Sequence, residues 1–534
     1  MHALLATLLF AVISSTAAAA ERTVDRLQRE ARGFYLLWGE GRPGADEIMR
    51  LPFIRGGQIV VQWGDVETGP GKYDFSAVDS ALARFAASGR WTTIQINGNI
   101  KPAWLFTQVP YVREQFDEQV RNREGTLMFW HPRFREAHLA MLAAFARHLR
   151  SSPHQSRLLG LRLNFNPVGT EHFNFPEQYR TPDKWTVPPG VDRATVAAFT
   201  PELQKTYEGE VVTTYERLFS DWTTVFVRNN IGDELRARYA AHFKNGRLAF
   251  FHTSSEAEPR AAGIERQYGA FHDFCRSGLT VGYAEPWASA WGEHGGILDS
   301  RWCSPPQWNY WTLLFNLHCG VSFIGEYYTN LYFATTGRHG RTAVPPDSAE
   351  PREFMAAYAW GAEYIGLHNR PAESPGAWVA FRDNKAAKAV NPKVPAPRRQ
   401  LNRFAGDYNW LAERVGDDRS EGVGPIGPDE QRYGAFARRY PAGASARVRL
   451  DPKFVASLAG DATVRIIALN GAPAEARIGA RAFQLPASDA RWRTTEFRVP
   501  AASLRENAGF NLEVRAGAQP LTLHMVEVRR GPAP

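Results

Sequence analysis

Two glutamates in this chain each follow a short apolar segment and have aromatic neighbours. Glu171 lies in the loop NPVGTEHF, and Glu285 ends the segment LTVGYAE. A buried parallel strand that ends in a polar loop with a carboxylate is how a (β/α)8 barrel presents a catalytic group. Breaking a glycosidic bond requires two carboxyl groups, one protonated and one ionised at the same pH. We therefore predict that Glu171 and Glu285 form the catalytic pair of a sugar-cleaving site.

Other aromatic and polar residues fall at or near the ends of expected strands, where they could contact a sugar. Aromatic faces stack on pyranose rings, and Asn and His form hydrogen bonds with hydroxyl groups. The predicted substrate-binding residues are Trp38, Trp63, Asn97, Trp104, Asn166, His252, Trp287, Trp291 and Glu326. Glu326 is also the alternative nucleophile, and any single Trp could instead be buried in the barrel wall. Because no His, Asp or Glu cluster has the spacing of a zinc site, we expect no metal and no cofactor.

Eight short segments rich in β-branched and aromatic residues alternate with amphipathic stretches. The expected strands are residues 33–38, 57–63, 91–97, 158–164, 222–227, 247–252, 279–283 and 321–324. The expected helices are residues 75–88, 132–151, 201–220, 233–244, 261–277 and 305–319. Eight strand-then-helix units close into a (β/α)8 TIM barrel. An open doubly wound sheet is the rival, but no G-x-G-x-x-G or phosphate loop follows the first expected strand.

After residue 364 the pattern changes to short alternating runs separated by turn residues, which indicates antiparallel strands. We expect residues 21–370 to form the barrel, 371–429 to hold a linker and joining strands, and 430–534 to form a jelly-roll-like β-sandwich. The fold class is thus α/β followed by all-β. Trp492 is the clearest candidate for an exposed aromatic in the sandwich, so structural support of the barrel is favoured over glycan binding.

The N-terminus predicts export. Residues 4–13 are an apolar core of the length that secretory signals use, and Ala-x-Ala matches follow near residue 20. We expect residues 1–20 to be a signal peptide and the protein to be secreted or periplasmic, although no Lys or Arg precedes the core. No later run of about 18 apolar residues occurs, so membrane insertion is not expected.

The net charge of +8 is scattered along the chain rather than clustered. Nucleic acid needs a clustered basic patch and is not expected as a partner, whereas an acidic polysaccharide remains compatible with the charge. Three cysteines, Cys275, Cys303 and Cys319, allow at most one disulfide and fit small buried apolar positions. No motif specifies an oligomeric state.

A patterned segment covers residues 56–106. Its characteristic positions are Trp63, Glu67, Gly71, Tyr73, Asp74 and Phe75, followed by Pro102, Trp104 and Leu105. The segment resembles the early barrel of clan A glycoside hydrolases, particularly the family 42 β-galactosidases. In those enzymes the acid/base ends strand four and the nucleophile ends strand seven, which by resemblance assigns these roles to Glu171 and Glu285.

The fourth-strand loop departs from that pattern. The clan usually has Asn directly before its acid/base, where this chain has Thr170. The NPVGTE loop is instead similar to the G-P-x-G-E loop of β-amylases, which are inverting barrels. The resemblance therefore implies a hydrolase of O-glycosidic bonds in an oligo- or polysaccharide, retaining by the first likeness and inverting by the second. A non-catalytic barrel that binds polysaccharide is the third alternative.

Overall fold

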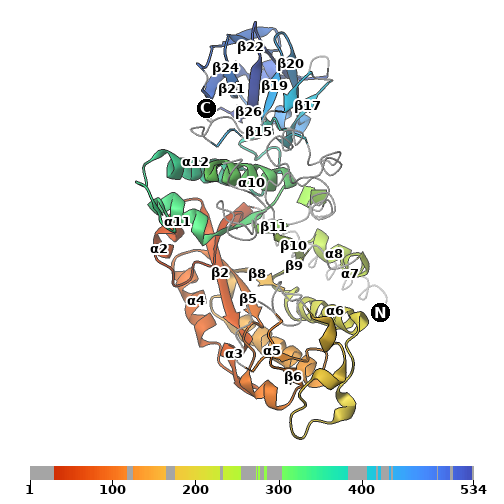
Figure 1. The fold of residues 1–534 in the computed structure, drawn as a ribbon. Helices are drawn as coiled ribbons and strands as arrows, with labels where there is room; N and C mark the ends of the chain where they lie inside the picture. The colour runs from red at the N-terminus through yellow and green to blue at the C-terminus, as the bar shows by residue number, and fades with distance from the viewer. Residues whose placement is uncertain are drawn as a thin grey trace, which may run out of the picture.

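The structure is a computed structural model. It describes residues 29–116, 124–163, 175–228, 233–253, 272–273, 275–276, 282–285, 304–382, 406–416, 419–422, 432–434, 437–489, 491–505 and 509–531. For residues 252–253, 282–285 and 421–422 only the backbone is described. Figure 1 shows a barrel with its surrounding helices and, beyond α10 and α12, a separate group of β-strands.

Eight parallel strands close into the barrel. They are β1 (Gly33–Leu37), β2 (Ile54–Gln62), β5 (Trp91–Asn97), β8 (Leu158–Arg162), β9 (Thr224–Arg228), β10 (Leu248–Thr253), β11 (Gly282–Glu285) and β12 (Phe323–Tyr327). Their order around the barrel is β1-β12-β11-β10-β9-β8-β5-β2. Every expected strand overlaps one of them, so the predicted barrel is confirmed.

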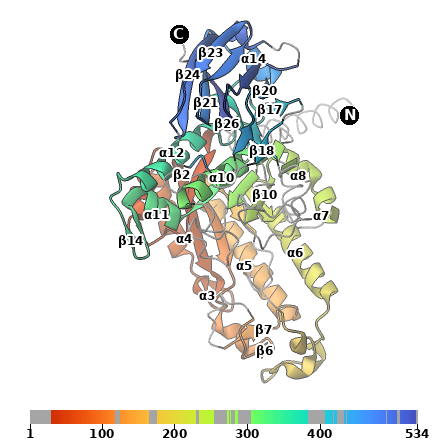
Figure 2. The same ribbon diagram turned by 45° about the horizontal axis from the view of Figure 1, so that its top comes forward.

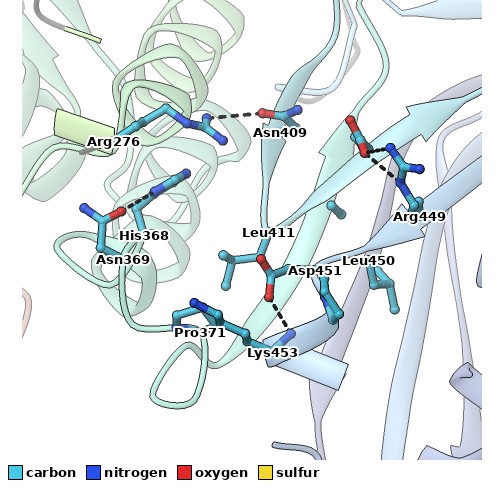
Figure 3. Close-up of a pocket in the computed structure, with 13 residues that line it drawn as sticks. Arg276, His368, Asn369, Pro371, Asn409, Leu411, Arg449, Leu450, Asp451 and Lys453 are labelled. Atoms are coloured by element: carbon cyan, nitrogen blue, oxygen red, sulfur yellow. Dashed lines mark hydrogen bonds and ion pairs between the residues drawn. The ribbon is translucent and has the colours of Figure 1, made fainter. Parts of the chain in front are cut away.

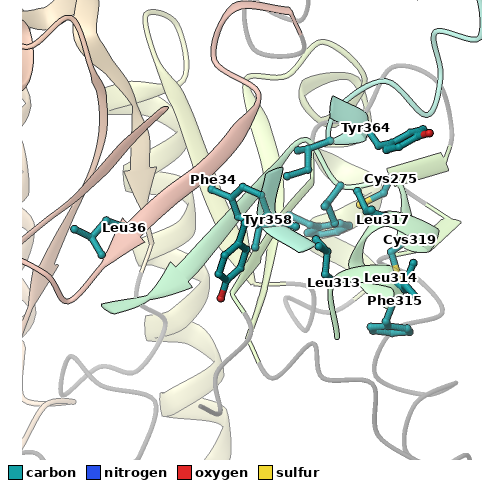
Figure 4. Close-up of a cluster of buried hydrophobic side chains, with 14 of the residues drawn as sticks. Phe34, Leu36, Cys275, Leu313, Leu314, Phe315, Leu317, Cys319, Tyr358 and Tyr364 are labelled. Atoms are coloured by element: carbon teal, nitrogen blue, oxygen red, sulfur yellow. The ribbon is translucent and has the colours of Figure 1, made fainter. Parts of the chain in front are cut away.

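Side chains alternate between the interior of the barrel and its outer wall. Phe226 of β9 contacts Phe323 of β12 with ring centroids 6.0 Å apart, although β10 and β11 lie between these strands. Such a contact is possible only across the interior. The outer positions of β1, Phe34 and Leu36, belong to the outer cluster, and the ring of Phe34 lies 5.2 Å from that of Tyr358 on α12 (Figure 4).

The helices cover the outer wall. They are α2 (Ala45–Arg50), α4 (Ser76–Ala87), α5 (Pro132–Ser151), α6 (Pro201–Phe219), α7 (Asp233–Arg238), α8 (Ala240–Lys244), α10 (Pro305–Cys319), α11 (Tyr328–Thr336) and α12 (Ala349–Tyr364). α5 and α10 begin with proline in the first turn as predicted, and Ser304 forms a capping box with Gln307 on α10. The expected helix 233–244 is interrupted at Tyr239, whose ring is buried and whose backbone leaves helical geometry.

The C-terminal part forms two antiparallel sheets. The first contains β15 (Gly376–Ala380), β16 (Tyr408–Trp410), β18 (Glu421–Gly422), β19 (Arg438–Tyr440), β21 (Asp461–Asn470), β24 (Arg493–Pro500) and β26 (Leu521–Arg530). The second contains β17 (Ala412–Val415), β20 (Ser445–Leu450), β22 (Ala474–Ile478), β23 (Arg481–Leu485) and β25 (Leu512–Arg515). The C-terminal β-sandwich is therefore confirmed, and strands from the region between residues 371 and 429 are part of its sheets.

The sandwich packs on α10 and α12, as both views show (Figures 1 and 2). The indole of Trp360 on α12 donates to the Glu527 carboxylate at 3.0 Å, and the Tyr364 hydroxyl donates to the same oxygen. On α10, the Trp311 indole donates to the carbonyl of Gly434 at 2.6 Å. α10 is buried along nearly its whole length because the barrel covers one side and the sandwich the other.

Three further expectations can be compared with the structure. The expectation that Trp492 is exposed is wrong: its side chain is buried, and its ring packs on Tyr433 and His524. Cys275 and Cys319 are free thiols in buried positions, as predicted for small apolar residues, while Cys303 lies outside the described residues. None of the described helices combines the length and apolarity that crossing a bilayer requires.

Candidate active site

The backbone register places Glu285 among the positions that face the barrel interior. Glu285 is the last residue of β11, the seventh barrel strand, and pairs with Thr253 of β10. Two residues earlier, Tyr283 pairs with Phe251 on one side and Phe323 on the other, and both partners line the interior. Because side chains alternate along a strand, position 285 belongs to the same series as position 283. The seventh strand thus ends at the carboxyl-terminal rim with a glutamate in the inward register.

The other strand-end glutamate, Glu326, lies in the opposite series. It pairs with Leu36 of β1, which belongs to the outer cluster, whereas the next residue, Tyr327, packs on the interior cluster. The Glu326 carboxylate accepts a 2.8 Å hydrogen bond from the Asn330 amide and is also hydrogen-bonded to Tyr358 of α12. Burial raises the pKa of Glu326 to about 7. Its carboxyl group therefore sits between the wall and the helices, on the side away from the barrel interior.

Polar side chains line the interior below the rim on β2 and β5. The Gln58 amide donates to the Gln95 side-chain oxygen at 3.1 Å, and the Gln95 amide donates in turn to Asn97. All three are buried, and the side-chain oxygen of Gln58 has no hydrogen-bond partner. A buried acceptor without a partner costs free energy, so this oxygen is suited to a water molecule or a substrate hydroxyl. Asn97, predicted to bind substrate, is thus part of an interior polar row.

A cation occupies the interior at the end of the fourth strand. The Arg162 guanidinium lies 4.5 Å from the ring centroid of Phe251 on β10, and its side chain is only 3% exposed. Phe251 pairs in turn with position 283, two residues before Glu285. A buried positive charge near this rim favours the ionised form of any neighbouring carboxyl group.

The predicted tryptophans differ in exposure. Trp38, directly after β1, is 36% exposed and has a left-handed backbone (φ 53°), which is uncommon for a bulky residue. Trp63 is 2% exposed, and its indole donates to the Glu67 carboxylate at 2.7 Å. The expectation that Trp63 offers a face to a sugar is therefore corrected: its ring packs between Phe134 and His138 of α5. Trp104 is half-buried, with the Arg133 guanidinium 5.2 Å from its ring.

The remaining predicted residues have no described side chain. Glu171, Asn166, Trp287 and Trp291 lie outside the described residues, and His252 and Glu285 are described by their backbone alone. The interior residues Arg162, Gln58 and Gln95 were not predicted from the sequence. The period-2 alternation of β5 offers a signal for Gln95, because polar side chains alternate there with isoleucine. Gln58 has no such signal, since three apolar residues follow it in β2.

Metal binding has no candidate among the described residues, where no group of three His, Cys, Asp or Glu side chains comes together.

Comparison with known proteins gives one family match. The model of glycoside hydrolase family 42, described as β-galactosidase, matches residues 53–158, a segment that runs from just before β2 to the start of β8. No curated protein matched the sequence. The match covers less than half of the chain, so it shows that the early barrel is similar to that of glycoside hydrolase family 42.

Several solved structures are similar at low identity. A β-galactosidase from Rahnella sp. R3 is 12% identical, with 63% of this chain and 57% of that chain covered and a TM-score of 0.36. A glucosidase from Croceicoccus marinus is 10% identical over 92% of both chains, with a TM-score of 0.34. Endo-glycoceramidase II from Rhodococcus sp. is 11% identical over 94% of this chain and 97% of that chain, with a TM-score of 0.35. The barrel topology itself rests on the strand pairing described above.

Proposed function

We propose that the chain is an exported, retaining glycoside hydrolase in which Glu285 is the nucleophile and Glu171 the acid/base. The observation that carries the proposal is the position of Glu285, in the inward register at the carboxyl-terminal end of the seventh strand of a closed barrel. Active sites of such barrels form at this rim. Glu171 follows the fourth strand, β8, so its loop starts from the same rim.

The proposed reaction has two steps. In the first, Glu171 donates its proton to the leaving oxygen while the Glu285 carboxylate attacks the anomeric carbon and forms a glycosyl ester. In the second, Glu171 removes a proton from a water molecule, which attacks the same carbon and releases Glu285. Each step inverts the anomeric centre, so the product retains the original configuration. Arg162 supports the first step because a buried cation nearby holds a carboxyl group in its ionised form.

The proposed substrate is a β-glycoside, and a β-galactoside is the first one to test. The family match to a β-galactosidase motivates this order. The matched segment ends before the loop of Glu171 and well before Glu285, so it bears on the early barrel and leaves the choice of sugar to experiment. Export rests on the N-terminal segment, and removal of residues 1–20 from the secreted protein would be visible by mass spectrometry.

Aryl glycosides of several sugars, with an activated and a poor leaving group for each, test the proposal. Glu285→Gln is expected to lower kcat by several orders of magnitude for every substrate, because it removes the covalent step while keeping the shape of the side chain. Glu171→Gln is expected to lose most activity on the poor leaving group and to form the glycosyl ester readily with the activated one. Proton NMR of the first product anomer reports retention or inversion.

The same experiment separates the alternatives. An inverted first product would replace the retaining mechanism with the β-amylase-like one. A wild-type protein that binds an oligosaccharide but hydrolyses none of the panel would support a binding barrel. Full activity in Glu285→Gln would remove Glu285 from the chemistry.

A further inference from the structure

Four polar side chains form a column inside the barrel, on the neighbouring strands β2 and β5. Thr93, Gln95 and Asn97 occupy alternate positions of β5, and Gln58 of β2 pairs with Thr93 in register. The isoleucines between the β5 positions belong to the outer cluster, and all four polar side chains are buried. Because branched apolar side chains usually fill the interior of such a barrel, a buried polar column there requires an explanation.

The hydrogen bonds of this column run in one direction, from the interior toward the rim. The Gln58 amide nitrogen donates to the Gln95 oxygen at 3.1 Å, and the Gln95 nitrogen donates to the Asn97 oxygen. At the inner end, the Gln58 oxygen and the Thr93 hydroxyl have no hydrogen-bond partner among the described residues. The hydroxyl of the residue paired with Gln58 can donate to that oxygen, directly or through one water molecule. The column is therefore a head-to-tail chain in which each amide orients the next.

This chain determines which end of the Asn97 amide is directed to the rim. Asn97 is the last residue of β5, and its oxygen accepts the hydrogen bond from Gln95 below it. The nitrogen of a planar amide points away from the oxygen, so the Asn97 nitrogen is directed away from Gln95 and acts only as a donor. With an apolar residue at position 95, the column would no longer distinguish the two ends of the amide. Gln95 thus sets Asn97 as a donor.

Asn97 lies across the barrel from Glu285. In the order around the barrel, three strands separate β5 from β11 on either side. Both residues end their strands in the inward register. An eight-stranded barrel is only wide enough to be filled by side chains or to hold one small ligand. A sugar ring attacked from the Glu285 side is therefore bordered by Asn97 on the other side.

We propose that Gln95 and Gln58 are positioning residues that hold the Asn97 amide as a hydrogen-bond donor to one hydroxyl oxygen of the sugar bound opposite Glu285. This role rests on the proposed function, because the sugar is bound at the same rim. An amide N–H donates to a lone pair on the hydroxyl oxygen, and a deoxy position has no such acceptor. The site therefore selects glycosides that carry this hydroxyl group.

Monodeoxy aryl glycosides, derived from the best substrate of the panel, test this role. The wild type is expected to lose about tenfold or more in kcat/KM on the analogue that lacks the contacted hydroxyl. Gln95→Met should lower kcat/KM about tenfold for the parent glycoside and little for that analogue, so that the discrimination disappears. Gln58→Met should give the same pattern with a smaller loss. Asn97→Asp should match Gln95→Met, because its ionised carboxylate accepts from Gln95 and has no N–H to donate.

Two matched variants report the effect of changing an amide elsewhere in the protein. Gln307→Met removes a buried glutamine that caps α10. Asn369→Asp changes an amide that lies beside His368, after α12 (Figure 3). Both should lower Tm at most and leave the discrimination between the parent glycoside and the deoxy analogue intact. If Gln95→Met fails to fold, Asn97→Asp and Asn97→Ala at the rim provide the same comparison.

Three results would overturn the proposed role. An equal loss of activity by Gln95→Met on the parent and on every deoxy analogue would make the column purely structural. Full discrimination in Asn97→Asp would show that the N–H is not needed. Calorimetric binding of the free sugar and its deoxy analogues tests the contact without hydrolysis, so it distinguishes failure of this role from failure of the proposed function. No difference between the parent and any deoxy analogue, in binding to the wild type, would overturn the role even if hydrolysis is confirmed.

Discussion

Replacing Glu326 by glutamine tests the assignment of this residue to the wall of the barrel. In its neutral form the Glu326 carboxyl completes a row of hydrogen bonds: Asn330 donates to one oxygen, the acid proton can be given to the Tyr358 oxygen, and Tyr358 donates to Asn309 at 2.8 Å. A glutamine amide reproduces this row, since its oxygen accepts from Asn330 and its nitrogen donates to Tyr358. The substitution therefore removes the ionisation and keeps the packing.

The magnitude follows from the pKa. Because burial raises the pKa of Glu326 from 4.5 to about 7, ionising it in the folded protein costs about 3 kcal/mol more than in the unfolded chain. This cost is absent below pH 4.5, grows as the pH rises, and is fully present above about pH 7. Glu326→Gln should accordingly leave the free energy of unfolding nearly unchanged at pH 4.5 and raise it by up to about 3 kcal/mol at pH 8.

Thermal unfolding between pH 4.5 and pH 8 measures this difference, with the wild type and Glu350→Gln as references. Glu350 is an exposed acid in the first turn of α12, so its substitution should shift Tm by little and equally at both pH values. Hydrolysis by Glu326→Gln should remain close to the wild-type rate. A variant that is inactive, with Glu285→Gln active, would make Glu326 the nucleophile and refute the placement. A Tm difference that does not grow with pH would refute the burial argument.

Three other perturbations have defined outcomes. Arg162→Gln should shift the apparent pKa of the acidic limb of the kcat/KM profile upward by about one unit, because a cation that stabilises the ionised form of the nucleophile is lost. An unchanged pKa would show that Arg162 does not act on the nucleophile. Trp38→Ala should raise KM several-fold with Tm nearly unchanged, because its side chain is exposed. Trp63→Ala should lower the free energy of unfolding by about 3–5 kcal/mol, because its ring is buried. The reverse pattern would contradict the exposed fractions of the two side chains. A chain that ends at Tyr364 should be insoluble or unstable, since it uncovers the sandwich-facing side of α10 and α12; a soluble, cooperatively folding barrel would show that the sandwich is dispensable.

The barrel could be predicted because each strand is a short apolar run and several helices carry clear start signals. The helix 132–151 and the helix 305–319 begin and end as expected, since proline in the first turn and a following breaker fix their limits. The side of the barrel wall to which a strand residue points was harder to predict. Glu285 and Glu326 have the same strand-end pattern, and only the register against neighbouring strands separates the inward position from the outward one.

Burial of single aromatic residues also depends on contacts that are distant in sequence. Trp63 follows an apolar strand as Trp38 does, but α5 covers its ring, and that contact carries no local signal. Trp492 is covered by Tyr433 and His524 for the same reason. Arg162 could not be predicted because a single arginine in an apolar run resembles a strand terminus, whereas its side chain lies inside the barrel over Phe251.

The pairing of β15 with β26 has a consequence for how the protein is made. β15 directly follows the barrel in the chain, but its partner β26 is the last strand of the described sequence, and β26 also joins β19 and β21. β15 can pair with β16 earlier, but its other edge stays open until β26 has been synthesised. The nascent chain therefore carries β15, and the Trp360 and Tyr364 side chains of α12 that donate to Glu527, without these partners until β26 is made. Such delayed closure places the final step of sandwich assembly after nearly all of the described chain has been synthesised.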